Sequence, residues 1–253
     1  MRRFTSYAAA GLLVVCAAAA APTAEAAGKM CNGAVATIVG TPGDDVLTGT
    51  TGADVIAALE GDDRVEALAG NDFVCGGEGT DTLIGGDGAD SLRDGLGGGV
   101  IRGGAGNDSI MGAVMVGDDT QAVAGGPGRD FYFLRFVVQG AATLSEVSGQ
   151  VDLLHGRATI EAGHQETQLP VTGMEAIRVS RGSWTLYGSS RDEVFLGGSH
   201  VARVAIFARG GSDMLAGTVR HDVLNGGPGI DTVEATPGND RCISLERVID
   251  GPC

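Results

Sequence analysis

Aspartates that recur every nine residues are the side chains best placed to do chemistry in this sequence. When the chain is divided into blocks of nine from Gly40, aspartate takes the sixth position of every block but one as far as Met111, and again from Ala208 to Ile243. A further copy precedes Phe131. Carboxylate oxygens are ligands that calcium prefers. The predicted metal ligands are therefore Asp45, Asp54, Asp63, Asp72, Asp81, Asp90, Asp108, Asp130, Asp213, Asp222, Asp231 and Asp240.

Glycines surround these aspartates in a fixed pattern, GGxGxD. The full pattern begins at Gly76, Gly85, Gly103, Gly125 and Gly226. Glycine permits positive φ and close backbone approach, so the chain can turn sharply and point carbonyl oxygens inward. Calcium takes six to eight oxygen ligands, more than one short loop supplies, so a stacked neighbouring loop must contribute. The glycines assigned to the site are Gly76, Gly79, Gly85, Gly88, Gly103 and Gly106.

Short strands must position these loops. After each aspartate comes a triplet whose middle residue, at position eight, is aliphatic; from Leu47 to Ile110 these residues are Leu47, Ile56, Val65, Val74, Leu83, Leu92, Ile101 and Ile110. Such side chains lie on one face of a strand and predict a narrow core. Two nonapeptides per turn bring like residues together every eighteen positions. The pattern predicts an all-β fold, a right-handed parallel β-roll (β-solenoid).

Composition restricts the class of partner. The formal net charge is −15, Lys29 is the only lysine, and aromatic residues make up 4% of the chain. A nucleic-acid role lacks both a cationic surface and stacking platforms, so calcium ions are the expected partner. Acidic, aromatic-poor chains are often disordered, and this alternative holds unless the carboxylates bind cations. The sequence identifies no protein or polysaccharide partner.

The five GGxGxD copies and their spacing resemble the hemolysin-type calcium-binding (RTX) repeat family. The opening CNGAVATIVGTPGDDVLTGT and the closing NDRCISLERV look like secreted actinobacterial members of that family. The resemblance implies calcium binding and no particular activity. Gly99 in place of aspartate, alanine at Ala58 and Ala67, and Arg220 in place of the fourth glycine depart from the pattern, and those sites are expected to be weaker or empty.

The nonapeptide is absent between Phe131 and Tyr187, although apolar residues still alternate there as in strands. This segment resembles the connector between repeat blocks in the same family and is expected to continue the solenoid without calcium. His155, Glu161, His164 and Glu166 could form a zinc or acid/base site, but HExxH spacing is absent and solvated strand residues are the favoured interpretation. Without a GxSxG elbow or a Walker loop, the chain is not expected to be an enzyme. The alternative is a secreted polysaccharide-active enzyme or an adhesin that uses the solenoid face.

The N-terminus predicts export. Arg2 and Arg3 precede an apolar run and the small-residue stretch Ala24-Glu25-Ala26, which is typical of a signal peptide. A lipoprotein signal ending at Cys16 is the weaker alternative, because Val15 is branched. The chain is expected to be secreted to the extracellular space, with no later membrane span. The expected organisation is a signal peptide (1–26), a cap strand (27–39), calcium-binding repeats (40–130), a connector (131–187), further repeats (188–243) and a C-terminal cap (244–253).

Four cysteines remain after the signal peptide, an even number for an oxidising compartment. Cys242 and Cys253 are the favoured pair, since the tail could fold over the open end of the roll. Cys31 and Cys75 would then pair by elimination. Extrapolating the repeat register places those two at opposite ends of strands two turns apart, an objection that a non-helical N-terminal cap would remove.

Overall fold

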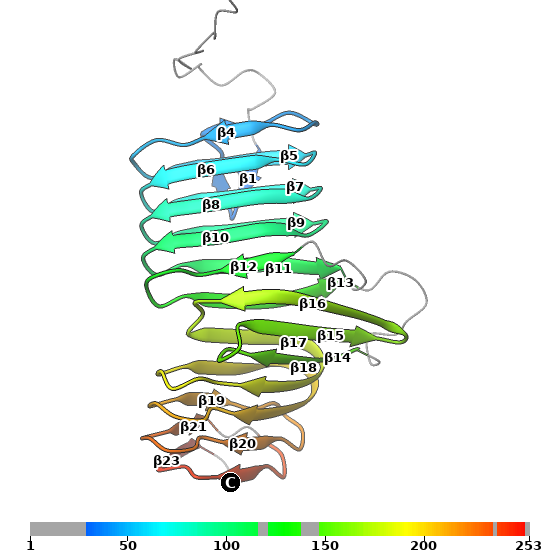
Figure 1. Cartoon of the computed structure of the whole chain (residues 1–253), viewed down its shortest axis with the longest axis vertical. Coiled ribbons are helices and arrows are strands. Elements are labelled where there is room, and N and C mark those ends of the chain that lie inside the picture. Colours follow the sequence, from blue (N-terminus) through cyan, green and yellow to red (C-terminus); the bar gives the residue numbers. More distant parts are fainter. Residues whose placement is uncertain (1–28, 116–120, 138–146, 235–236, 251–253) are drawn as a thin grey trace, which may run out of the picture.

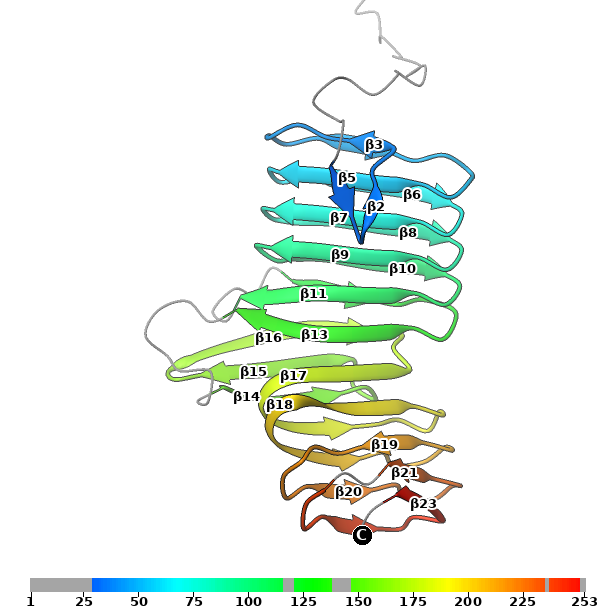
Figure 2. The ribbon, with the colours of Figure 1, turned by 180° about the vertical axis from the view of Figure 1, so that it is seen from behind.

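The structure is a computed structural model that describes residues 29–115, 121–137, 147–234 and 237–250. Figure 1 shows its strands stacked along the long axis, and Figure 2 shows the opposite face of the stack. The described ranges contain no helix, and so none that could cross a membrane. The strands are β1 (Met30–Cys31), β2 (Ala34–Val35), β3 (Ile38–Val39), β4 (Val46–Thr48), β5 (Val55–Glu60), β6 (Arg64–Ala69), β7 (Phe73–Glu78), β8 (Asp81–Asp87), β9 (Ser91–Leu96), β10 (Gly99–Ala105), β11 (Ser109–Met115), β12 (Ala122–Ala124), β13 (Phe131–Val137), β14 (Val147–Asp152), β15 (Arg157–Ala162), β16 (Gln165–Thr172), β17 (Ala176–Tyr187), β18 (Val194–Phe207), β19 (Met214–Ala216), β20 (Val223–Asn225), β21 (Thr232–Glu234), β22 (Arg241–Ile243) and β23 (Arg247–Asp250).

Strands two apart in the sequence pair in parallel, which places successive strands on opposite faces of the roll. On one face β5 pairs with β7, β7 with β9 and β9 with β11; on the other β4 pairs with β6, β6 with β8 and β8 with β10. Ile56 pairs with Val74 and Val74 with Leu92, so each register step equals two nonapeptides. The predicted all-β, parallel β-solenoid is confirmed.

The position-eight side chains form the core between the two faces. Leu47, in the first turn, is only partly buried. The remaining ones of the first repeat block are fully buried: Ile56, Val65, Val74, Leu83, Leu92, Ile101 and Ile110. A fully buried aliphatic side chain contributes about 1.5–3 kcal/mol, so one residue in nine supplies much of the apolar stabilisation of each turn.

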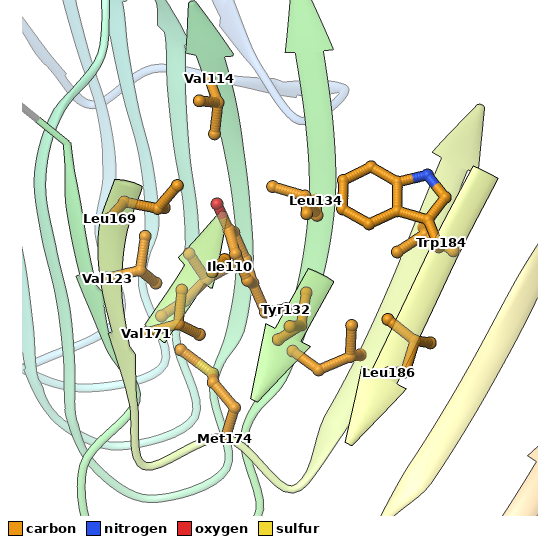
Figure 3. Packing of buried hydrophobic residues seen from close by; sticks show 14 of the residues in the cluster. Ile110, Val114, Val123, Tyr132, Leu134, Leu169, Val171, Met174, Trp184 and Leu186 are labelled. Carbon is orange, nitrogen blue, oxygen red and sulfur yellow. The ribbon is translucent and has the colours of Figure 1, made fainter. Parts of the chain in front are cut away.

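The middle of the chain departs from pure parallel stacking. β13, β17 and β18 continue the parallel face, but β14, β15 and β16 form an antiparallel meander beside it. A two-residue turn at Gly163 and His164 joins β15 to β16, and so short a connection makes a hairpin, not a parallel crossover. The expected continuation of the solenoid therefore holds for only part of this segment. Figure 3 shows the core of this segment, in which Tyr132 and Trp184 belong to the same cluster as the aliphatic side chains.

A small hairpin outside the roll carries the first cysteine of the described chain. β1 and β2 pair antiparallel, and β1 lies against β5 and β7 (Figure 2). Cys31 is bonded to Cys75 in β7, with 5.7 Å between their Cα atoms. The register objection to this pair fails because Cys31 lies on the hairpin and does not follow the nonapeptide register. Cys253, like the proposed signal peptide, lies outside the described residues, so its pairing with Cys242 stays a prediction.

Candidate metal centre in the turns of the roll

The position-six aspartates form two ladders along the edges of the roll. Along a ladder, Oδ1 of one aspartate accepts a hydrogen bond from the backbone N–H of the aspartate one turn earlier: the N–H of Asp45 donates to Asp63 (2.8 Å) and that of Asp63 to Asp81 (3.0 Å). The other ladder links Asp54, Asp72, Asp90, Asp108 and Asp130 in the same way. Asp213 donates to Asp231 and Asp222 to Asp240. The structure thus brings the predicted residues together in these ladders.

Three glutamates extend these ladders at positions where the sequence pattern identified no site residue. Asp130 N–H donates to Glu175, Glu193 N–H donates to Asp213, and Asp231 N–H donates to Glu246. Glu175 also forms an ion pair with Arg191 at 2.8 Å. The signal for these glutamates is weak, because the separations along the ladder are 45, 20 and 15 residues in place of eighteen.

Position five also has a structural role that the sequence pattern did not reveal. The side-chain oxygens of Asp62, Asn71 and Asn107 each accept a hydrogen bond, at 2.8 to 2.9 Å, from a backbone N–H of the following turn. Asp or Asn at this position therefore joins neighbouring turns by hydrogen bonds and needs no metal for that purpose.

The second carboxylate oxygen of most ladder residues is buried without a hydrogen-bond partner. This holds for Oδ2 of Asp63, Asp72, Asp81, Asp90, Asp108, Asp130, Asp213, Asp231 and Asp240. Except for Asp240, which is partly buried, these residues are almost fully enclosed; Asp90, for example, is 2% exposed. A buried carboxylate oxygen with no donor is costly, and natural structures rarely keep one without an ion or a water nearby.

Backbone carbonyl oxygens approach the same points. A Cβ placed on Gly85 would lie 2.3 Å from Oδ2 of Asp90 and 2.5 Å from the carbonyl oxygen of Gly103, one turn further on. Gly76 and Gly103 have equivalent surroundings. Only glycine leaves this space open, so the turns that begin at Gly76, Gly85 and Gly103 each hold a cradle lined by one carboxylate oxygen and one carbonyl oxygen.

The glycines at position four are required for a different reason. Gly79, Gly88 and Gly106 have φ values of 131°, 138° and 132°, which L side chains rarely adopt. A Cβ on any of them would lie about 2 Å or less from a carbonyl oxygen of the preceding turn; on Gly88 the distance is 1.6 Å. These glycines allow successive turns to stack at van der Waals distance.

The carboxylates are held in surroundings that disfavour their charge. Burial raises the pKa of Asp81 and of Asp90 to about 6; a backbone hydrogen bond lowers each pKa in part, and neighbouring aspartates raise it further. Burial likewise raises the pKa of Asp213 to about 7, and the neighbouring carboxylates of Glu193, Asp231 and Asp192 raise it further. Without a cation these groups bind protons at a higher pH than ordinary aspartates do, so the folded turns favour a bound positive charge.

These shifts predict that the metal-free chain gains structure as the pH falls. The pKa of an ordinary aspartate is 3.8, and in the folded turns it rises to between about 6 and 7. Between these limits the folded state binds more protons than the unfolded state, so stability decreases as pH rises. In chelator, the β signal in circular dichroism should increase from pH 8 to pH 5. A β signal that is flat or falls over this range would contradict the assignment.

The repeat that lacks its aspartate has a carboxylate at another position. Gly99 stands at position six, and Asp94, at position one of the same repeat, is 1% exposed. Gln121 donates a hydrogen bond to Asp94 at 3.3 Å, and the buried Tyr132 hydroxyl lies near them. Burial raises the pKa of Asp94 to about 8, and the charge of Asp81 adds to the effect. The polar groups in this repeat therefore differ from those in the regular turns.

The candidate residues of the middle segment are not brought together. His155 lies in the turn before β15 and His164 in the turn after it, at opposite ends of that strand. His155 contacts Asp152, which also binds Arg209, and this pairing lowers the pKa of Asp152 despite its burial. Glu161 lies 3.5 Å from the Ser148 hydroxyl, and Glu166 accepts a hydrogen bond from Gln168. The arrangement is that of strand and turn residues with local partners.

The oxygen atoms that line the turns are suitable ligands for calcium. The ligands available are carboxylate and backbone carbonyl oxygens, which hard divalent cations prefer. Across the described ranges, no three His, Cys, Asp or Glu side chains converge to hold a metal by themselves. A metal here would therefore need backbone carbonyl oxygens as well, and the cradles at Gly76, Gly85 and Gly103 each place one near a carboxylate oxygen.

Comparison with known proteins agrees with this geometry. A family described as "RTX calcium-binding nonapeptide repeat (4 copies)" matches residues 39–74, 76–110 and 206–243. These ranges include most of the ladder and exclude the antiparallel meander. No curated protein matches the chain. The chain therefore carries RTX calcium-binding nonapeptide repeats, folded as a parallel β-roll.

Proposed function

We propose that this chain is an extracellular calcium-binding module whose roll is stabilised by calcium ions held between successive turns. The observation that carries the proposal is the row of buried, unpartnered Oδ2 atoms, which at Asp81, Asp90, Asp108 and Asp130 face the same space as a carbonyl oxygen of the next turn. Each bound ion would neutralise these carboxylates and join two turns. The extracellular location rests on the N-terminal sequence and on the repeat family.

The strongest sites are proposed in the turns that have glycine at positions one, two and four. These turns contain Asp81, Asp90, Asp108, Asp130 and Asp231. The repeats of Asp63, Asp72 and Asp213 have alanine at position one, where the regular repeats need glycine to leave the cradle open, and weaker binding is proposed there. Isothermal titration of the purified chain with calcium tests the function directly, and absence of binding at millimolar calcium would refute it.

Removing a position-six carboxylate should weaken calcium binding more than removing an exposed carboxylate of the same repeat. Asp90→Asn keeps the Oδ1 acceptor but removes the charge, and it should raise the calcium concentration needed for half-maximal folding roughly tenfold. Asp87→Asn is a matched control, since Asp87 belongs to the same repeat and is exposed. Calcium titrations followed by circular dichroism measure both. Equal effects would show that position six has no special role.

A groove on the outer face supports a second candidate function, the binding of a polysaccharide chain. It has a volume of about 610 Å³ and lies over β14, β15, β17 and β18. Its lining includes Gln150, Thr185 and Phe207, and the Phe207 ring stacks on Tyr187 at 5.4 Å. Glu161 is the single carboxylate among the lining residues. Glycoside hydrolysis ordinarily needs two carboxylates, so the groove favours an adhesin over an enzyme as this alternative.

A further inference from the structure

Among the described residues, three turns of the ladder are closed by threonine. Thr41, Thr50 and Thr218 occupy position two of their repeats, where the full motif has glycine. The backbone N–H of each donates to Oδ2 of the aspartate four residues later, at 2.6, 2.6 and 2.5 Å. The hydroxyl of each donates to the same oxygen, at 3.0, 2.9 and 2.9 Å. The oxygen that is unpartnered elsewhere in the ladder thus has two donors in these turns.

The backbone of the glycine turns is different. Gly86 and Gly104, at position two before Asp90 and Asp108, have φ values of 115° and 118°. Leu59, Leu68 and Arg209 also adopt positive φ at this position, and the aspartates of their repeats keep an unpartnered Oδ2. The three threonines do not adopt positive φ. The conformation at position two therefore separates the turns into two kinds.

The two kinds of turn have opposite electrostatic preferences. A calcium ion is bound by lone pairs, and an N–H directed at the same carboxylate oxygen places positive partial charge where the ion would lie. Two donors also satisfy the buried carboxylate, because hydrogen bonds to an ionised acceptor are short and strong. A turn closed in this way needs no cation, and an ion entering it would have to displace both donors.

On the premise that the other turns bind calcium as proposed above, we infer that the turns of Asp45, Asp54 and Asp222 bind none and are closed by Thr41, Thr50 and Thr218. Two of the three are the first turns of the roll, next to the Cys31–Cys75 disulfide. The N-terminal end of the roll is therefore held by hydrogen bonds and one covalent bond, and calcium orders the turns that follow. Ser189 and Glu193 form a related turn, but Oε2 of Glu193 remains unpartnered, so that turn is not closed in the same way.

The sequence offers a direct conversion between the two kinds of turn. Thr50→Gly changes GTTGAD to GGTGAD, a full copy of the motif. This variant should bind one calcium ion more per chain than the wild type at saturation. Asp54→Asn should bind as many ions as the wild type, whereas the matched variant Asp90→Asn should bind one fewer. Equilibrium dialysis with elemental analysis counts the ions, and circular dichroism verifies that each variant is folded at saturating calcium.

Each outcome has a distinct meaning. If the wild type binds no calcium, the proposed function fails. If the wild type binds calcium and Asp54→Asn loses one ion as Asp90→Asn does, or if Thr50→Gly gains none, the inference about the threonine turns fails while the proposed function remains. Should Asp54→Asn not fold, the gain expected in Thr50→Gly decides the question alone.

Discussion

Removing calcium with a chelator should unfold most of the roll, with loss of the β signal in circular dichroism. From Asp81 to Asp130, four aspartates stack along the two edges with buried carboxylate oxygens that no hydrogen bond satisfies. Without a cation their burial and mutual repulsion oppose folding, so the free energy of calcium binding becomes free energy of folding. Refolding should occur at calcium concentrations on the order of 10⁻⁴ to 10⁻³ M, the range of extracellular modules.

Magnesium is the appropriate control for this experiment. It requires near-octahedral geometry and gives up its water reluctantly, so it should not restore the β signal at the same concentration. Residual structure in chelator should be confined to the first turns, around β3 to β5, where Thr41 and Thr50 satisfy the ladder. An unchanged β spectrum between chelator and millimolar calcium would contradict the whole account.

Much of the fold can be predicted from the sequence because its period determines both the turn and the core. Glycine at fixed positions determines where the chain turns, and one aliphatic residue in nine, such as Val74 or Leu92, determines which side faces inward. Since both signals repeat in the same register, the eighteen-residue pairing of strands follows directly. The ladders of buried aspartates are a consequence of that pairing.

The parts that could not be predicted depend on contacts that have no fixed spacing. Glu175 and Glu246 join the ladder at separations of 45 and 15 residues in place of eighteen, so only the folded chain places them beside Asp130 and Asp231. The role of Thr50 also depends on three-dimensional geometry, because threonine at position two resembles a simple loss of glycine until its two hydrogen bonds to Asp54 are visible. The meander of β14 to β16 interrupts the period altogether.

The Cys31–Cys75 disulfide, expected by elimination, is confirmed, and the geometric objection to it treats Cys31 as part of the roll. In the structure the β1–β2 hairpin lies across the outer side of one face, and Cys31 is 1% exposed beside Ala57. Cys75 occupies position nine of its repeat, whose side chain points outward toward this hairpin. The outward position of Cys75 in its repeat was the sequence signal that its disulfide partner lies outside the core.

Replacing both cysteines, Cys31→Ser with Cys75→Ser, should destabilise the N-terminal turns by about 4 kcal/mol, the value that the chain-entropy model assigns to a loop of 44 residues. Because the stability of stacked repeats is approximately a sum of nearest-neighbour contributions, the loss should be local. Hydrogen exchange should therefore accelerate in β3 to β7 and remain slow in β20 to β22, at saturating calcium. The residual structure in chelator should also disappear, since threonine hydrogen bonds alone would then hold that end. Uniform acceleration along the roll, or none in the first turns, would show that the hairpin does not secure the N-terminal end.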